Sequence, residues 1–267
     1  MDVSDNISKG EISMRKPFIA GNWKMHKTIA EAVDFSRRLC KEAQQFTGDR
    51  NILIAPPFTA LSAVAKIVAG TGIHLAAQNL HESPQGAFTG EVSGAMVAEA
   101  GCDYVLIGHS ERRHIYGETD DLLSRKVEAA RKSGLKVIFC VGETLDEREK
   151  GKTFRIVEKQ MKEGLKAFKE DDIERFVIAY EPVWAIGTGK TATPEQAEEV
   201  HVLIRDLQKK LYGAAAADAL IILYGGSVTP GNIAELMAKE NVDGALIGGA
   251  SLDVESFLRM IMFDRPE

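Results

Sequence analysis

The sequence predicts an α/β protein, a single-domain (β/α)8 barrel with eight parallel strands, and three observations support that prediction. Short apolar runs alternate with amphipathic stretches at helical spacing, and this alternation is repeated eight times. The repeats together occupy about 250 residues, the usual length of such a barrel. No glycine-rich dinucleotide-binding turn follows the first apolar run, which makes an open, doubly wound sheet the weaker alternative.

The first four repeats are recognised by apolar, strand-forming runs that precede helical patterns. The runs cover residues 18–24, 52–55, 73–78 and 103–107. The helical patterns that follow cover residues 28–46 and 61–68, a short stretch around Met96, and residues 122–131. A long segment, residues 79–92, separates the third run from its helix and is predicted to be a surface loop.

The last four repeats have apolar runs over residues 135–141, 175–180, 220–224 and 242–247. Thr144 and Glu147 have the spacing of a capping box, which predicts a charged helix from there to about residue 168. Thr193 before Pro194 predicts a helix over residues 194–211. Thr229-Pro230 predicts another helix start, and a last helix is predicted over residues 254–262.

Composition excludes several classes of protein. Lys and Arg number 33 against 39 Asp and Glu, a net charge of -6 without a basic block, which argues against nucleic acid as a partner. The apolar runs fall short of the roughly 20 residues that a membrane-spanning helix needs. Cys40, Cys102 and Cys140 are odd in number and widely spaced, so neither a disulfide framework nor a zinc site is expected, and a reducing cytoplasm fits best. The six histidines form no metal-ligand pattern.

The first residues differ in character from the rest of the chain. They are polar and lack the apolar core of a signal peptide. We therefore expect residues 1–15 to be a disordered tail and residues 16–267 to be the catalytic barrel domain.

Chemically distinctive side chains fall at the ends of predicted strands, where such barrels place their active sites. Asn22 and Lys24 lie two residues apart, which would put both on one face of the first strand. His109 follows the fourth strand and precedes a short helix, whose positive end favours a neutral imidazole. Glu181 ends the sixth strand with no cation beside it in sequence, and a buried carboxylate is costly unless it has a function.

The segment after Glu181 is predicted to be a lid over the site. Pro182 and the Thr191-Ala192 pair stiffen its two ends, its glycines free the tip, and its apolar side chains suit closure that excludes water. Its residues are Pro182, Val183, Trp184, Ala185, Ile186, Gly187, Thr188, Gly189, Lys190, Thr191 and Ala192. Gly189-Lys190-Thr191 imitates the end of a nucleotide-binding P-loop, but Trp184 stands where that motif needs a glycine.

Ser227, Gly248 and Gly249 end the seventh and eighth strands, where barrels often bind phosphate through backbone N–H groups. The net charge does not oppose an anionic ligand, because exposed charges are screened within about 8 Å at physiological salt. Residues 225–229 resemble a nucleophile elbow around Ser227, but Thr229 stands where that motif needs its last glycine. Phosphate binding is therefore the better interpretation.

Four motifs together resemble the triosephosphate isomerase family, whose fold is the TIM barrel. They are Asn22-Trp23-Lys24, Gly108-His109-Ser110-Glu111-Arg112-Arg113, residues 179–190, and Tyr224-Gly225-Gly226-Ser227-Val228. The resemblance extends from about Lys16 to the C-terminus, and only the N-terminal tail departs from it.

The resemblance implies interconversion of dihydroxyacetone phosphate and D-glyceraldehyde 3-phosphate, a step of glycolysis and gluconeogenesis, without cofactor or metal. Glu181 would be the base, His109 a neutral donor to the carbonyl, and Lys24 and Asn22 stabilisers of the enediolate oxygen. Gly187, Ser227 and Gly249, with Gly248 beside them, would hold the phosphate.

The resemblance also implies a homodimer, in which the long third loop docks into a neighbouring subunit. Thr89 would approach the partner's active site, and Glu91 could pair with Arg112 across the interface. Two alternatives remain open at this point: another phosphosugar isomerase or epimerase on the same barrel, and a non-catalytic interaction protein that kept the fold.

Overall fold

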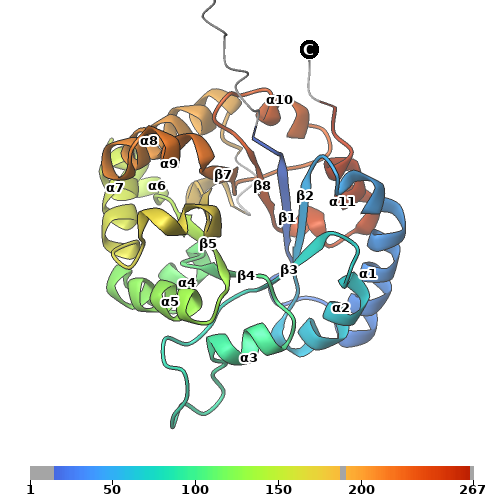
Figure 1. Cartoon of the computed structure of the whole chain (residues 1–267). Helices are drawn as coiled ribbons and strands as arrows, with labels where there is room; N and C mark the ends of the chain where they lie inside the picture. The colour runs from blue at the N-terminus through green and yellow to red at the C-terminus, as the bar shows by residue number, and fades with distance from the viewer. Residues whose placement is uncertain (1–14, 187–190, 265–267) are drawn as a thin grey trace, which may run out of the picture.

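The computed structural model describes residues 15–186 and 191–264. Within these residues eight parallel strands close into a barrel, each pairing with the next and the last with the first (Figure 1). The strands are β1 (Phe18–Asn22), β2 (Asn51–Ala55), β3 (Ile73–Ala77), β4 (Tyr104–Ile107), β5 (Lys136–Val141), β6 (Phe176–Tyr180), β7 (Ile221–Tyr224) and β8 (Gly244–Ile247). The predicted (β/α)8 barrel is confirmed, and the open sheet is wrong.

Helices surround the barrel in the described part of the chain (Figure 1). They are α1 (Ile29–Ala43), α2 (Leu61–Val68), α3 (Gly94–Glu99), α4 (Ser110–His114), α5 (Asp120–Lys132), α6 (Leu145–Glu149), α7 (Thr153–Gly164), α8 (Pro194–Tyr212), α9 (Ala214–Ala219), α10 (Ile233–Met237) and α11 (Val254–Ile261). None of the helices described is long and apolar enough to cross a membrane.

Two predicted helix starts are capped as the sequence indicated. The Thr144 side chain accepts the N–H of Glu147, whose carboxylate accepts the N–H of Thr144 in return. Thr193 and Gln196 exchange the same pair of hydrogen bonds at the start of α8, with a proline at the first helical position. Each box satisfies backbone donors that a helix end would otherwise leave without partners.

Two predicted helices have different bounds in the structure. The charged helix expected over residues 144–168 is two helices, α6 and α7, separated at Gly151, whose φ of +65° is a left-handed conformation that does not continue a helix. The helix expected to begin at Thr229-Pro230 begins at Ile233 instead. There the Asn232 side chain accepts the Thr229 N–H at 2.8 Å and closes a turn ahead of the helix.

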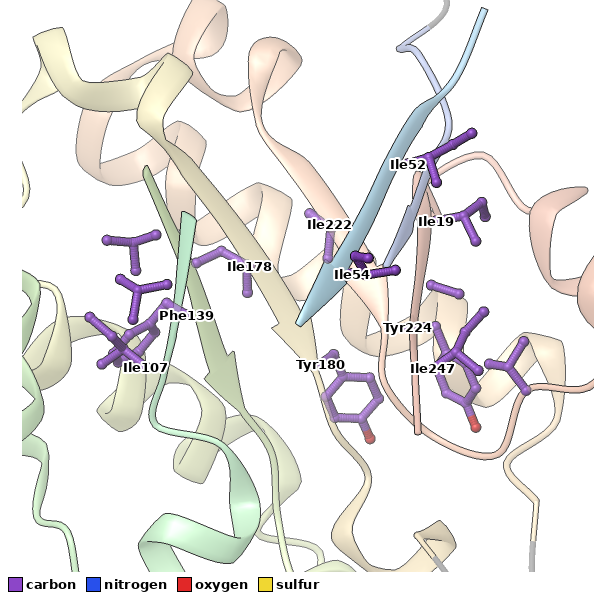
Figure 2. Close-up of a cluster of buried hydrophobic side chains, with 14 of the residues drawn as sticks. Ile19, Ile52, Ile54, Ile107, Phe139, Ile178, Tyr180, Ile222, Tyr224 and Ile247 are labelled. Atoms are coloured by element: carbon purple, nitrogen blue, oxygen red, sulfur yellow. The ribbon is translucent and has the colours of Figure 1, made fainter. Parts of the chain in front are cut away.

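The alternation of side chains along each strand produces two apolar layers. Phe18, Ala20 and Leu53 belong to a cluster that fills the barrel. Ile19 and Ile52 belong to a larger cluster, formed with apolar residues of the helices, that lies between the strands and the surrounding helices (Figure 2). Because both faces of every strand are buried, the strands read as continuous apolar runs in the sequence.

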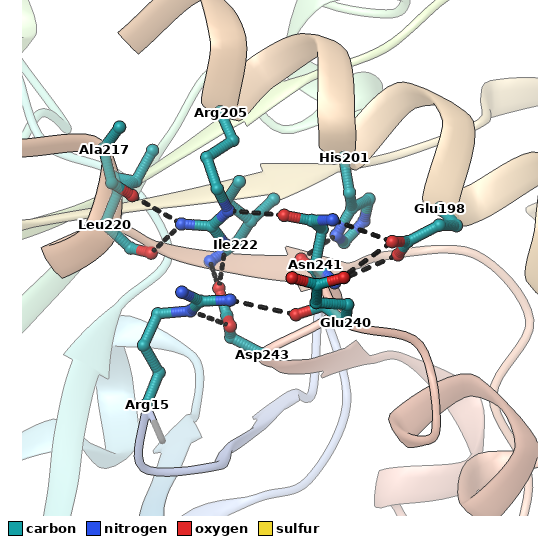
Figure 3. Close-up of polar contacts among 10 residues, drawn as sticks. All are labelled: Arg15, Glu198, His201, Arg205, Ala217, Leu220, Ile222, Glu240, Asn241 and Asp243. Carbon is teal, nitrogen blue, oxygen red and sulfur yellow. Dashed lines mark hydrogen bonds and ion pairs between the residues drawn. The ribbon is translucent and has the colours of Figure 1, made fainter. Parts of the chain in front are cut away.

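A polar network closes the barrel at the amino ends of β7 and β8 (Figure 3). Arg205 of α8 donates to the carbonyls of Ala217 and Leu220 at 2.6 and 3.0 Å and to the Asp243 carboxylate at 2.7 Å. Arg15, which the sequence assigned to the tail, also contacts Asp243. The prediction for the rest of the tail lies outside the described residues.

Candidate active site

A cavity of about 320 Å³ opens at the carboxyl ends of the strands. It is lined by segments that follow β1, β4, β6, β7 and β8. Among its lining residues are nine of those expected to carry function: Asn22, Lys24, His109, Glu181, Ala185, Ile186, Ser227, Gly248 and Gly249. Gly187, predicted to bind phosphate, lies outside the described residues.

Glu181 enters the cavity directly after β6 and is 2% exposed. Its backbone N–H donates to the Val141 carbonyl at 2.7 Å, which extends the pairing of β5 with β6 by one residue. One carboxylate oxygen accepts the Ser110 N–H at 2.9 Å, and the other lies 3.0 Å from His109 Nε2. The carboxylate that had no cation beside it in sequence therefore has two partners in space.

These partners set the acidity of Glu181. Burial opposes its ionisation, but the His109 ring, the Ser110 N–H and the charge on Lys24 outweigh burial and lower the pKa of its carboxyl below the ordinary value. The carboxylate is therefore ionised and stabilised in this arrangement. A glycine is needed beside it, because a Cβ on Gly225 would lie 2.8 Å from the Glu181 Cγ atom.

His109 caps α4 with its own ring. Its Nδ1 accepts the Glu111 N–H at 3.3 Å, which leaves the ring proton of a neutral imidazole on Nε2, facing Glu181. Burial opposes a charge on the ring, whereas the neighbouring Glu181 carboxylate outweighs burial and raises the pKa of His109 above its ordinary value. The hydrogen bond to Nδ1 favours the neutral donor that the sequence predicted, and the raised pKa depends on Glu181 remaining in contact.

Lys24 does not lie on the first strand, contrary to the sequence-based expectation. The strand ends at Asn22, and Lys24 has a φ of 53°, a left-handed conformation that is costly for a residue with a side chain. Two side chains hold this conformation. The Asn22 side chain accepts the Lys24 N–H at 3.1 Å, and Gln78 donates to the Lys24 carbonyl at 2.8 Å.

The Lys24 ammonium lies near both Glu111 and the end of β8. Its Nζ atom is 2.7 Å from a carboxylate oxygen of Glu111. A Cβ built on Gly248 would lie 3.8 Å from the same Nζ atom. A ligand anion near Gly248 would therefore be within reach of this charge.

The backbone around the eighth strand end is open to the cavity. Gly249 begins a short 3₁₀ helix, Gly249–Ser251, and a Cβ at this position would meet no atom within 4 Å. Ser227 follows β7 on the neighbouring side of the cavity. Small residues at both strand ends let a ligand approach the main chain closely.

The start of the predicted lid is attached to the β5 end through Glu143, which is fully buried. The Glu143 carboxylate accepts hydrogen bonds from Trp184 Nε1 at 2.9 Å and from the Tyr180 hydroxyl at 3.1 Å. Its carbonyl accepts the Val183 N–H at 3.1 Å. Arg148 contributes a further hydrogen bond to the carboxylate and lies over the Trp184 ring. Residues 187–190 lie outside the described residues.

The residues expected at a dimer interface lie near the same rim. Thr89 and Glu91 are exposed on the long loop that follows β3. Arg112 pairs within its own chain, since its Nε donates to Glu118 at 2.6 Å. A partner subunit would therefore meet an Arg112 that already has one carboxylate bound.

Sequence reasoning gave no role to Ser110, Glu111, Gln78 or Glu143. Ser110 acts through its backbone N–H, which no side-chain pattern reveals, although its place in the first turn of a helix after His109 was a signal. Gln78 and Glu143 are partners of residues 54 and 41 positions away in the chain, and such contacts exist only once the barrel closes.

Comparison with known proteins identifies the family. The model of the family described as "Triosephosphate isomerase" matches residues 17–263. The chain is 54% identical over 248 residues to Triosephosphate isomerase of Carboxydothermus hydrogenoformans, covering 93% of this chain and 98% of the relative. It is 51% identical over 250 residues to that of Syntrophotalea carbinolica (94% and 99% covered) and 53% identical over 249 residues to that of Borreliella burgdorferi (93% and 98% covered). The chain therefore belongs to the triosephosphate isomerase family and is an aldose-ketose isomerase.

Proposed function

We propose that the cavity at the carboxyl ends of the strands interconverts dihydroxyacetone phosphate and D-glyceraldehyde 3-phosphate by proton transfer through an enediolate. The observation that carries the proposal is the convergence of a carboxylate, an imidazole and an ammonium group, from Glu181, His109 and Lys24, on one cavity of about 320 Å³. Moving a proton between adjacent carbons needs a base, a stabiliser of the developing oxyanion and protection from water.

Glu181 is the base in this proposal. In this structure its two oxygens are bound by His109 and Ser110, which lowers its pKa and weakens it as a proton acceptor. A substrate carbonyl that takes the Nε2–H of His109 displaces one carboxylate oxygen. Loss of that hydrogen bond frees Glu181 to accept a proton from the carbon beside the carbonyl and to return it to the neighbouring carbon.

His109 and Lys24 stabilise the oxyanion. The ring donates from Nε2, because Nδ1 is already occupied as an acceptor from the Glu111 N–H. Lys24 supplies a positive charge to the same cavity, and the Asn22 side chain fixes its main chain. Donors fixed in place before the reaction need no reorganisation as negative charge develops on the substrate oxygen.

The substrate phosphate binds at the ends of β7 and β8 in this proposal. The backbone N–H groups of Ser227 and Gly249 are the donors, with Gly248 beside them, and Lys24 lies within reach of the same anion. Gly187 would complete the set from outside the described residues.

We further propose that residues 182–192 act as a lid. Support comes from the described part of this segment, where Ala185 and Ile186 line the cavity and Ala192 is buried. Trp184 and Val183 connect the segment to Glu143. Closure over the site would exclude water, strengthen the electrostatic interactions inside and protect the enediolate from losing its phosphate.

A homodimer is the proposed assembly. Exposed apolar side chains occur in segments that follow β1, β3 and β4, which are strands on one side of the barrel. Among them are the four most exposed of the large apolar side chains in the described residues, Met25, Met96, Ile115 and Tyr116. Apolar side chains gathered on one side of a protein commonly mark a contact with another chain. The cytoplasm is the proposed location, in keeping with three free, buried thiols and a glycolytic reaction.

The proposal is tested by incubating the protein with dihydroxyacetone phosphate in heavy water and following the products by NMR. We expect the aldehyde to form and deuterium to enter at the carbon next to the carbonyl, without added metal or cofactor. Deuterium uptake without the aldehyde, or no reaction at all, would overturn the assignment of the reaction.

A further inference from the structure

The turn that presents His109 begins where β4 leaves the barrel. Pairing between β4 and β5 ends at Ile107 and Phe139. The next residue, Gly108, has a φ of +77°, a left-handed conformation that turns the chain into the cavity. Because His109 follows directly, the orientation of its ring depends on how firmly this turn is held.

The departure of β4 leaves a carbonyl on β5 without its ladder partner. Carbonyls of successive strand residues point to opposite neighbours, and the Val141 carbonyl accepts the Glu181 N–H on the β6 side. The Cys140 carbonyl therefore faces β4. A buried carbonyl in this position needs another donor.

Arg113 of α4 supplies that donor and holds the turn at the same time. Its Nη2 donates to the Cys140 carbonyl at 3.0 Å, and its Nε donates to the Gly108 carbonyl at 2.8 Å. Its Nη1 donates to Asp120 at 2.6 Å, which anchors the guanidinium to the start of α5. The arginine side chain is only 8% exposed, so these bonds are sheltered from water.

The fit around this guanidinium is tight. A Cβ built on Gly108 would lie 3.0 Å from Arg113 Nη2 and 3.1 Å from the Cys140 carbonyl oxygen. The Phe139 ring lies 5.5 Å from the guanidinium carbon. Three bonds from one planar group to a turn, a neighbouring strand and a helix fix its orientation, which the single ammonium of lysine could not do.

We propose that Arg113 is a positioning residue for the reaction, which acts by fixing the Gly108 turn and thereby the direction of His109 Nε2. This inference rests on the proposed role of His109 and adds to it a residue that does not touch the cavity. Asp120 anchors the same guanidinium, because it accepts from Nη1, the nitrogen that donates to neither carbonyl.

The test replaces Arg113 by lysine and measures kcat and KM separately. We expect Arg113→Lys to lower kcat about 10- to 100-fold, the loss typical of a displacement near 1 Å, with KM changed less than about threefold. If that variant does not fold, Asp120→Asn keeps the arginine and its two carbonyl contacts. It is expected to lower kcat by roughly three- to tenfold, with KM again changed less than about threefold.

Arg205→Lys is the matched control. Arg205 also binds two main-chain carbonyls and one aspartate, and its side chain is 12% exposed, but it lies at the amino ends of the strands (Figure 3). Arg205→Lys should lower the thermal stability as much as Arg113→Lys does. Its kcat should stay within about twofold of that of the unaltered protein at a temperature where both variants are folded. An equal fall of kcat in the two variants would mean that Arg113 acts only through stability.

A double variant separates this inference from the proposed function. In a His109→Gln background, Arg113→Lys should lower kcat by less than about threefold, because a residue that acts through His109 has no further effect once the ring is absent. A full 10- to 100-fold loss in that background would overturn the inference. A His109→Gln variant with unchanged kcat would instead overturn the role of His109 itself.

Discussion

Glu181 offers the most direct test of the proposed chemistry, because its reach into the cavity depends on the length of one side chain. Glu181→Asp withdraws the carboxylate by roughly the length of one C–C bond, about 1.5 Å. We expect kcat to fall about 100- to 1000-fold and KM to stay within about threefold, since the phosphate contacts proposed at β7 and β8 are untouched. Steady-state kinetics in both directions measures this.

The control for this substitution is Glu235→Asp on α10, an exposed position that should leave kcat and KM unchanged. Turnover of Glu181→Asp equal to that of the unaltered protein would remove Glu181 from the mechanism.

His201 predicts how stability depends on pH. Burial lowers the pKa of its ring to about 4, although its Nδ1 is within 3.0 Å of the Asn241 carbonyl. In the unfolded chain the pKa is about 6.5, so neutral burial stabilises the fold fully above that pH. As the pH falls from 6.5 towards 4, the unfolded chain binds a proton that the folded chain does not. The free energy of unfolding therefore falls by about 1.4 kcal/mol per pH unit.

At pH 5 this linkage amounts to about 2 kcal/mol relative to pH 7.5. We expect the free energy of unfolding of His201→Gln to fall between pH 7.5 and pH 5 by about 2 kcal/mol less than that of the unaltered protein. Urea titrations at equal protein concentration measure this difference. His26→Gln, at an exposed position, should follow the unaltered protein. Equal losses in all three proteins would show that His201 is not the group that titrates.

The sequence indicated the individual candidates for catalysis but not their partners. Glu181 and His109 could be predicted because each polar group directly follows an apolar strand, and the barrel brings the strand ends to one rim. The contact between Glu181 and the Ser110 N–H joins residues 71 positions apart and involves no side chain of Ser110. The left-handed conformation of Lys24 was equally hidden, because periodicity assigns it to a strand.

Among the connecting segments, the proposed lid gives a prediction about side reactions. Deleting residues 186–188 shortens the cover while leaving Glu181 and the Glu143 contacts of Trp184 in the chain. We expect the enediolate to be exposed to water and to lose its phosphate, so that inorganic phosphate is released in proportion to substrate consumed. A phosphate assay run alongside turnover measures this ratio.

The same deletion combined with Glu181→Gln is the control, because without the base no enediolate forms and phosphate should stay at background. Background release from the deletion alone would argue against a protective role for residues 182–192.

Element types were easier to predict than element ends. The α8 cap at Thr193 follows from local hydrogen bonds, and the sequence carries all of its parts. The break between α6 and α7 depends on Gly151 adopting a φ of +65°, and a glycine within a charged helical pattern does not by itself announce a stop. The end of β1 at Asn22 is set by the turn that carries Lys24. Gln78, the residue directly after β3, holds that turn by donating to the Lys24 carbonyl.

The closed barrel as a whole could be predicted because its strands are buried on both faces. Residues facing the interior and residues facing the helices belong to two separate apolar clusters, so each strand is apolar throughout and stands out from the amphipathic helices. Sheet closure itself leaves no local trace, and the evidence for it was the number of repeats, their total length and the lack of a dinucleotide-binding turn. The cavity arises from the packing of five separate segments and could not be derived from any one of them.

The proposed dimer is tested by changing charge on the long loop after β3. Thr89→Arg with Glu91→Lys adds three positive charges to an exposed segment that would insert near a second copy's active site. It also places a lysine where a carboxylate was proposed to meet Arg112, whose guanidinium would then face a like charge. We expect the double variant to elute from gel filtration as a single chain and to lose activity in parallel, since Thr89 would no longer support the partner's site.

Asp206→Lys with Leu211→Arg makes the same change in charge at exposed positions of α8, across the barrel from α3 (Figure 1). That control should remain dimeric and active, because α8 lies outside the segments after β1, β3 and β4 that carry the most exposed apolar side chains. A loop variant that stays dimeric at micromolar concentration would place the interface elsewhere. A fully active single chain would show that each cavity is complete without a second copy, and the functional role of Thr89 would then be wrong.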